Sequence, residues 1–194
     1  MRVFLADASG VIGVRLVPLL VAAGHVVAGM TRSVAKMEVV RALGAQPVVC
    51  DVFDAVALAE TVAACQPELV MHQLTDLPDE VERIPEYAAR NNRIRTEGTR
   101  NLLGAAREAG ATRFLAQSIA WTPHAGGAAV VEHERLVLAA GGVVLRYGAF
   151  YGPGTYSGAH RIPPPPRIHV DEAARRTLDA LEAPSGVITM VEDA

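Results

Sequence analysis

Short apolar stretches and helical patterns alternate along the whole chain. Each apolar stretch has the length of a strand that is buried on both faces of a sheet. The segments between them repeat apolar residues at helical spacing, and the first such segment ends at Gly24, a natural helix stop. The pattern predicts strands over residues 3–6, 26–30, 47–50, 68–72, 113–117, 143–147 and 187–190. It predicts helices over residues 14–23, 33–43, 54–64, 85–109, 130–140 and 171–182.

Strands that alternate with helices are typical of parallel βαβ units, because a crossover helix has to carry the chain back to the next parallel strand. We therefore predict an α/β fold with a doubly wound, Rossmann-like parallel sheet of about seven strands and helices on both faces. A single domain spans residues 1–194, with a core over 1–150 and a short substrate-side segment over 151–194. That segment begins with a loop, residues 152–166, which ends in a run of prolines.

Composition narrows the classes of function. The chain has 194 residues, of which 51% are hydrophobic and 20% charged, and its net charge is −3. Acidic and basic residues are mixed along the chain, so we expect neither a nucleic-acid partner nor a membrane partner. Cys50 and Cys65 fit no metal-ligand spacing. We expect two buried thiols, no metal and a cytoplasmic location, since no signal peptide precedes the first strand pattern.

The first predicted strand leads into the stretch LADASGVIG, residues 5–13. A glycine-rich turn at this place lets a dinucleotide pyrophosphate approach the backbone at a helix N-terminus. The residues that we assign to this turn are Ser9, Gly10, Val11, Ile12 and Gly13. Asp7 stands where the first glycine is expected, and a carboxylate about 5 Å from a pyrophosphate costs roughly 1 to 3 kcal/mol of binding. Asp7 either weakens cofactor binding or caps the helix by accepting from its first amides.

The end of the second predicted strand bears on the choice of cofactor. NAD-selective sites carry an acidic residue here for the ribose 2′-hydroxyl, whereas this chain has Arg32 in the stretch GMTRS. A guanidinium suits the 2′-phosphate of NADP(H), and a solvated surface arginine is the alternative. We expect NADP(H) if a cofactor binds, and the Asp7 carboxylate leaves open that none does.

The chain resembles the short-chain dehydrogenase/reductase superfamily, in its extended or atypical branch of NAD-dependent epimerases and dehydratases. The resemblance covers nearly the whole chain and rests on ASGVIG, CDVFD, VMHQLTDLP, RTEGTRNLLGAAREAGATRFLAQSIAW, LRYGAFYGPGT and IHVDEAARRTLDALE. It implies that Asp51 and Val52 lie near the adenine of the cofactor and that Ser118 is the active-site serine. It also implies a homodimer paired through the long helices, and a C-terminal substrate lobe that is nearly absent from this chain.

The resemblance fails at the catalytic dyad. Members that reduce or oxidise carbonyls usually carry Tyr-x-x-x-Lys, whose lysine lowers the pKa of the tyrosine. By register, Val131 falls at the tyrosine and Arg135 at the lysine. The only lysine in the sequence is Lys36, so no such dyad exists anywhere in it. Arg95 replaces an asparagine that is usual in the long helix.

Candidates for proton transfer remain at the strand ends. We expect a cleft there that gathers Asp7, His72, Gln73, Thr75, Ser118, Trp121, Tyr147 and Tyr151. The catalytic residues that we predict are Ser118, Tyr151, Asp7 and His72. His72 is an acid or base at neutral pH or a structural histidine, and Asp7 is a general base if the apolar turn raises its pKa. We interpret His133 and Glu134 as part of a solvated helix face.

Three functions fit these observations. The first is an atypical NADP(H)-binding oxidoreductase acting on a small-molecule substrate, in which Ser118 with Tyr151 or a water moves the proton. The second is a cofactor-independent cyclase, dehydratase or isomerase, for example of secondary metabolism, that uses Asp7 as acid or base in the same cleft. The third is a non-enzymatic nucleotide sensor.

Overall fold

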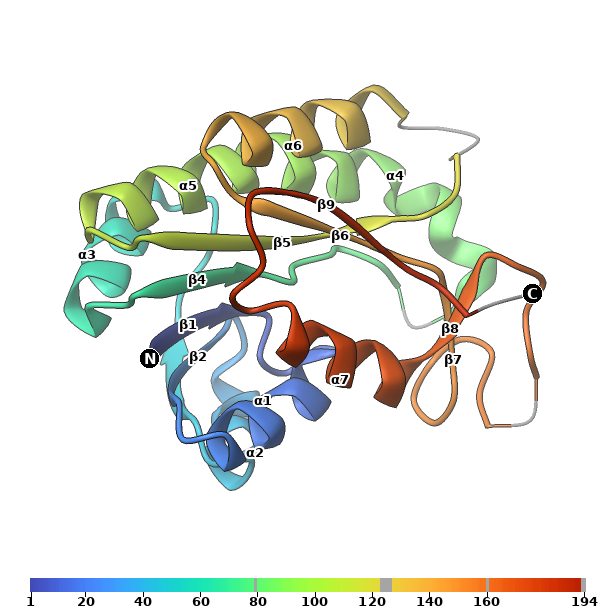
Figure 1. Ribbon diagram of the computed structural model, residues 1–194, viewed down its shortest axis with the longest axis horizontal. Helices are drawn as coiled ribbons and strands as arrows, with labels where there is room; N and C mark the ends of the chain where they lie inside the picture. Colours follow the sequence, from blue (N-terminus) through green and yellow to red (C-terminus); the bar gives the residue numbers. More distant parts are fainter. Residues whose placement is uncertain (79, 123–126, 160, 193–194) are drawn as a thin grey trace.

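Seven parallel strands form one central sheet in the computed structural model, which describes residues 1–78, 80–122, 127–159 and 161–192. The strand order is β3-β2-β1-β4-β5-β6-β9 (Figure 1). The strands are β1 (Arg2–Ala6), β2 (Val26–Thr31), β3 (Gln46–Val49), β4 (Leu69–His72), β5 (Arg113–Ile119), β6 (Val143–Tyr147) and β9 (Gly186–Met190). From β1 the chain adds β2 and β3 on one side and then β4, β5, β6 and β9 on the other. The direction in which strands are added therefore reverses between β1 and β4, although all seven strands are parallel. The predicted doubly wound α/β fold is confirmed.

Helices cover both faces of this sheet (Figure 1). One layer consists of α1 (Gly13–Ala22), η1 (Val34–Lys36), α2 (Met37–Ala42) and α7 (Val170–Asp179). The other consists of α3 (Ala55–Cys65), η2 (Val81–Arg83), α4 (Ile84–Arg93), η3 (Ile94–Gly98), α5 (Thr99–Glu108) and α6 (Gly127–Ala139). Because strand residues alternate between faces, each layer has its own core: Leu5 packs on the α1 side and Phe4 on the α3 side.

The long helix that we predicted over residues 85–109 is interrupted. α4 ends at Arg93, five residues of π-helix follow as η3, and α5 begins at Thr99. A π-helical turn inside an α-helix shifts the facing of the residues after it and is common at functional sites. Here it brings Thr99 to a fully buried position against the sheet.

The C-terminal segment contains a second sheet that the sequence pattern did not predict. β7 (Ala149–Tyr151) and β8 (Arg167–His169) pair in parallel, and the predicted proline-rich loop joins them. Both strands lie beyond the end of β6, at the right of Figure 1. Strands of three residues are too short to show an alternating pattern.

Candidate active site

The turn after β1 lies at the carboxyl ends of β1 and β4, where the order of the strands reverses. This is the place at which doubly wound sheets bind their ligands. Ser9 Oγ donates to Thr31 Oγ1 at 3.1 Å, which ties the turn to the end of β2. A Cβ at Gly13 would lie 2.2 Å from the carbonyl oxygen of Asp7, so α1 can begin this close only with glycine. Gly13 therefore has the packing role expected of the third glycine.

Asp7 occupies the position of the missing glycine. Its φ of 74° is the left-handed conformation that glycine adopts most easily. Its carboxyl lies against Gly10, where a Cβ would come 2.1 Å from Asp7 Oδ2. Burial raises the pKa of Asp7 to about 6, although the charges of Lys36 and Arg32 oppose the increase. Among the described residues no α1 amide donates to this carboxyl, so the structure shows no helix cap by Asp7.

Arg32, at the end of β2, shares a carboxylate with a second arginine. Its guanidinium forms an ion pair with Asp76 Oδ1 at 3.3 Å, and Arg90 reaches the same oxygen at 3.0 Å. The Asp76 side chain is almost fully buried, whereas 57% of the Arg32 side chain is exposed. Arg32 is therefore held at the sheet edge by one bond, while most of its guanidinium faces solvent.

The segment after β3 forms a small, well-bonded turn. Asp51 Oδ1 accepts from the Phe53 amide at 2.9 Å, and the Asp51 side chain lies at the surface. Val52 is buried, and its carbonyl accepts from Asn101 Nδ2 of α5 at 2.9 Å. The two residues expected near the adenine are thus fixed in place.

Gln73 follows β4 directly and is bonded to β1, because its amide donates to the Ala6 carbonyl at 3.1 Å. Only 3% of Gln73 is exposed. Its Nε2 donates to Tyr147 Oη at 3.5 Å, and Tyr147 Oη lies 2.6 Å from Thr177 Oγ1 of α7. Burial raises the pKa of Tyr147 to about 12, so this phenol stays protonated at neutral pH. Within the described part of the chain, Gln73 Oε1 has no hydrogen-bond partner.

His72 points to the opposite face and is fully buried with His133 of α6. His72 Nδ1 accepts from the Leu74 amide at 3.3 Å, so its Nε2 carries hydrogen and donates to Thr99 Oγ1 at 3.1 Å. His133 Nε2 donates to the Gln117 carbonyl at 2.9 Å, so its Nδ1 accepts from the Thr99 hydroxyl at 2.7 Å. Burial keeps the pKa of His72 well below its usual value and lowers that of His133 to about 4.

Both imidazoles are therefore neutral, with every ring nitrogen bonded inside the protein. The prediction that His133 belongs to a solvated face is wrong. The reason is that α6 packs this face on the sheet and buries Val130, His133, Glu134 and Val137 there. The predicted catalytic role of His72 gains no support from a ring whose nitrogens both have protein partners.

Ser118 lies within β5, in register with Arg146 of β6. Its hydroxyl donates to Glu134 Oε1 at 2.6 Å. Arg146 bonds both oxygens of the same carboxylate, at 2.9 and 2.5 Å. Burial acts to raise the pKa of Glu134, but the bonds from Arg146 and Ser118 outweigh it and hold the pKa below its usual value. Glu134 is thus a buried, ionised partner of Ser118, and its assignment to a solvated face is also wrong.

The register that we predicted for the catalytic dyad does not face the sheet. Val131 is 67% exposed, and Arg135 pairs with Glu132 on the outside of α6. The inward residues at the same spacing are Val130 and Glu134, one position earlier. An apolar side chain and a carboxylate thus face the sheet at the spacing of a Tyr-x-x-x-Lys dyad.

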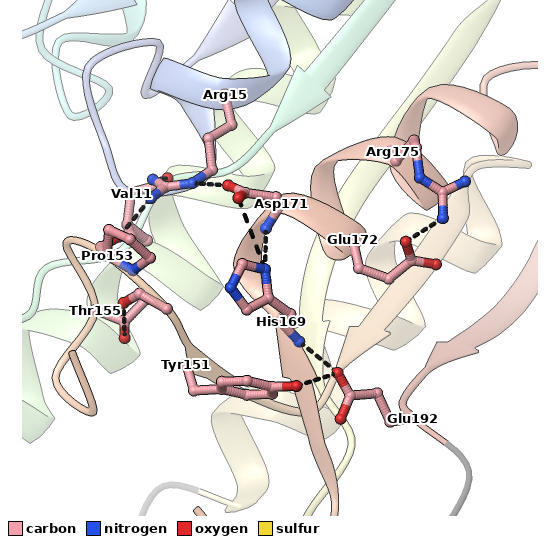
Figure 2. A network of polar contacts seen from close by, with 11 residues as sticks. Val11, Arg15, Tyr151, Pro153, Thr155, His169, Asp171, Glu172, Arg175 and Glu192 are labelled. Atoms are coloured by element: carbon pink, nitrogen blue, oxygen red, sulfur yellow. Dashed lines mark hydrogen bonds and ion pairs between the residues drawn. The ribbon is translucent and has the colours of Figure 1, made fainter. Parts of the chain in front are cut away.

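Tyr151 belongs to a different cluster, which Figure 2 shows. Its hydroxyl donates to Glu192 Oε1 at 2.7 Å, and the same oxygen accepts from the His169 amide at 3.0 Å. The bond to Glu192 raises the pKa of Tyr151. Ser118 and Tyr151 are therefore each bonded to their own carboxylate, and the structure shows no bond that would make them one proton-transfer pair.

A groove of about 680 Å³ lies beside this cluster, between α1 and α7. Its lining residues are Arg15, Leu19, His169, Asp171, Glu172, Ala174, Arg175 and Glu192. Arg15 closes one end by bonding Asp171 at 2.6 Å and the Val11 carbonyl at 2.8 Å (Figure 2). The groove is thus linked to the turn through Val11 but is not the space above Gly10.

The described residues contain no cluster of three or more histidine, cysteine or acidic side chains that could hold a metal ion. Nor do they include a helix with the length and apolar character needed to cross a membrane. Cys50 is buried as expected, but Cys65 is only half-buried, and both are free thiols.

A family model described as NAD(P)H-binding matches residues 8–138, from the turn to the end of α6. The chain belongs to this NAD(P)H-binding family. It is 37% identical, over 236 residues, to a 3-diazoavenalumate denitrifying reductase from a Streptomyces species. That alignment covers all of this chain and 76% of the relative. An alignment of 236 positions leaves 42 positions of the relative without a counterpart among the 194 residues here.

Solved structures give the same fold. UDP-glucose 4-epimerase from Thermus thermophilus, in complex with NAD, superposes with a TM-score of 0.83 at 20% identity, covering 100% of this chain and 78% of that one. The Thermotoga maritima UDP-glucose 4-epimerase with UDP-glucose has a TM-score of 0.81 at 18% identity, covering 98% and 77%. The predicted Rossmann-like fold and the NAD(P)-binding domain are confirmed, and the chain spans about three quarters of the length of the relative and of both epimerases.

Proposed function

We propose that this protein is an NAD(P)H-dependent reductase that acts on a diazo group and releases dinitrogen. The observation that carries the proposal is the bond from Ser118 to the Glu134 carboxylate, in a chain that has no Tyr-x-x-x-Lys dyad. The 37% identical relative, a denitrifying reductase named for a diazo carboxylate, supports the same chemistry.

Carbonyl reduction is poorly served by this site. Hydride addition to a carbonyl generates an alkoxide, which needs a proton donor or a positive group beside the oxygen. The Ser118 hydrogen is directed at an ionised carboxylate 2.6 Å away and not into the cleft. On α6, the side chains that face the sheet at dyad spacing are Val130, which has no proton, and Glu134, which is ionised.

Reduction of a diazo group makes no such demand. The aryl diazonium ion accepts a hydride and loses neutral N₂, so that Ar–N₂⁺ and H⁻ give Ar–H and N₂. Charge balances, no alkoxide forms, and the leaving group needs no proton. When bound, the dinucleotide would supply the hydride. The Ser118 lone pairs accept and do not donate, so they suit a cationic group better than a developing oxyanion, while Arg146 already neutralises the Glu134 carboxylate.

The cofactor would lie across the switch point. The turn of residues 9–13 would hold the pyrophosphate, Arg32 the 2′-phosphate, and Asp51 with Val52 the adenosine. Gln73, whose backbone is bonded to the end of β1, has a buried Oε1 without a partner among the described residues, which supports a site built for a ligand. The Asp7 carboxyl over Gly10 would have to turn aside or take up a proton when phosphate binds.

The test is a coupled assay on the purified protein with NADPH and ¹⁵N-labelled 4-carboxybenzenediazonium. NADPH oxidation is followed by absorbance and labelled N₂ by mass spectrometry, and 4-carboxybenzaldehyde serves as the carbonyl probe. We expect one N₂ per NADPH oxidised, no turnover of the aldehyde, and unchanged rates in the surface control Val131→Ala. Turnover of the aldehyde without N₂ release would overturn the proposal.

A cofactor-independent isomerase or cyclase remains a second candidate, favoured by one observation. The Asp7 carboxyl lies where a phosphate would approach Gly10, and its pKa of about 6 suits a general base. If this candidate is correct, the protein converts its substrate without any dinucleotide, and Asp7→Asn abolishes that turnover.

A further inference from the structure

We propose that Gln73 Oε1 is a hydrogen-bond acceptor for the nicotinamide half of the bound dinucleotide, and that it positions this half at the switch point. The inference rests on the proposed NAD(P)H site and assigns a role to a residue of the stretch VMHQLTDLP that the sequence analysis placed in the expected cleft without giving it a function. It starts from a buried amide oxygen that has no partner among the described residues. Native proteins rarely leave such an atom unpaired unless a ligand or water completes it.

The bonds around Gln73 fix which end of its amide is open. Thr177 Oγ1 donates its only hydrogen to the Ala173 carbonyl at 2.7 Å. It must therefore accept from Tyr147 Oη at 2.6 Å, which uses the phenol hydrogen. Tyr147 has no hydrogen left for an acceptor, so the Gln73 atom that faces it is the Nε2 donor at 3.5 Å. The oxygen of the amide is then the open end.

An open oxygen requires a ligand that donates. The phosphates of a dinucleotide only accept, so Gln73 cannot serve the pyrophosphate, which the neighbouring turn already accommodates. The nicotinamide half offers two kinds of donor, the ribose hydroxyls and the carboxamide N–H. The Gln73 backbone is bonded to Ala6, the residue before Asp7, and its side chain extends from there toward Tyr147 of β6, away from β1. A dinucleotide whose pyrophosphate lay at the turn would extend its nicotinamide half over the same strand ends.

The other buried side chains at this edge do not offer the same opportunity. Both nitrogens of His72 are bonded within the protein, and the Ser118 hydroxyl is directed at Glu134. Gln73 thus has a buried acceptor at this strand end that lacks a donor among the described residues.

The experiment compares Gln73→Met with wild type and with the surface control Gln46→Met. Methionine keeps the length of the side chain and removes both polar groups. Dissociation constants for NADPH and for 2′-phospho-ADP-ribose are measured by calorimetry, and the Tm of each unliganded protein by circular dichroism. We expect Gln73→Met to bind NADPH about tenfold more weakly, with an unliganded Tm equal to or above that of wild type. Gln46→Met should match wild type in both.

The second ligand separates the two kinds of donor. If Gln73→Met weakens both ligands, the donor is a ribose hydroxyl, and if it weakens NADPH alone, the donor is the carboxamide. Equal affinities of wild type and Gln73→Met for both ligands would overturn the inference and leave the proposed function standing. If wild-type protein binds neither ligand, the proposed cofactor site is wrong and the inference falls with it. A drop in Tm together with weaker binding would assign Gln73 a structural role and would also overturn it.

Discussion

His72 and Gln73 are adjacent residues at the end of one strand, yet they belong to two different polar networks. On the α5–α6 face, His72, Thr99 and His133 form a closed network, in which each ring nitrogen has a protein partner. On the α7 face, Gln73, Tyr147 and Thr177 form an open network, whose last oxygen has no partner among the described residues.

The contrast between these two networks gives a criterion for distinguishing residues that stabilise the fold from residues that bind a ligand. A network that satisfies all of its own donors and acceptors stabilises the fold and needs nothing further. A network with one unpaired buried atom carries a free-energy cost, which a ligand that pairs with this atom can remove. By this criterion we propose a structural role for His72 and His133, whose ring nitrogens all have protein partners, and a binding role for the amide of Gln73.

Removing the Thr99 hydroxyl from the closed network should reduce the free energy of unfolding more than any other substitution proposed here. Thr99→Val leaves His72 Nε2 and His133 Nδ1 buried without partners and should lower the free energy of unfolding by about 4 kcal/mol. Thr177→Val in the open network should cost only about 1 kcal/mol, because the Gln73 amide can rotate and accept from Tyr147. Urea unfolding followed by circular dichroism measures both, and Thr99→Ser, which keeps the hydroxyl, is the control. Equal losses for the two valine variants would remove the distinction between the networks.

Acidification should also reduce the stability that the closed network contributes, by a somewhat smaller amount. A histidine whose folded-state pKa is depressed contributes stability that is present above pH 6.5 and is lost as pH falls through the folded-state pKa. His133, with its pKa lowered from 6.5 to about 4, should account for a loss of about 3 kcal/mol between pH 7 and pH 4, and His72 adds to it. Unfolding titrations of Asp7→Asn isolate this loss, because the substitution removes the opposing carboxyl. NMR signals of the His72 or His133 imidazole that titrate near pH 6.5 in the folded protein would contradict the closed network.

Ionisation of Asp7 changes the pH dependence of stability in the opposite direction. Its folded-state pKa is raised from 3.8 to about 6, so its ionised form destabilises the fold above pH 6, and the penalty disappears below about pH 4. Asp7→Asn should therefore add about 3 kcal/mol of stability at pH 8 and almost nothing at pH 4. Asparagine keeps the size of the side chain and tolerates the left-handed backbone. Urea midpoints at the two pH values check this, and an equal gain at both would show that charge is not the cause.

The same substitution tests the approach of phosphate. With the charge removed, NADPH should bind about tenfold more tightly at pH 8, while at pH 5 wild type and variant should match. Tighter binding at neither pH would mean that the carboxyl does not meet the phosphate.

The smallest effect concerns cofactor choice. Arg32→Gln should weaken NADPH about tenfold, or about 1.4 kcal/mol, and leave NADH unchanged, because only NADPH carries the 2′-phosphate. Calorimetric titrations with both cofactors measure the ratio. Arg90→Gln is the matched control, since Arg90 shares the Asp76 carboxylate but lies on α4. Parallel losses for NADPH and NADH in Arg32→Gln would assign Arg32 to the fold alone.

The sequence predicted the sheet because apolar runs such as residues 3–6 report burial on both faces, a local property of the chain. It predicted Gly13 because close packing of helix on strand leaves a glycine requirement at one position. The burial of Glu134 was not predictable, because α6 carries polar residues on its inner face and their partners, Ser118 and Arg146, come from two other strands.

The open network was hidden for the same reason. Gln73, Tyr147 and Thr177 are far apart in the chain, and only the sheet register and the seating of α7 bring them together. Tyr151 likewise meets Glu192 through the short β7–β8 pair, which leaves no periodic signal in the sequence.

Calorimetric titration of the wild-type protein with NADPH at pH 6 and pH 8 tests whether the end of β4 receives a dinucleotide. We predict saturable one-to-one binding in the micromolar range, tighter at pH 6 than at pH 8 because Asp7 takes up a proton. No heat of binding at millimolar NADPH at either pH would contradict the account.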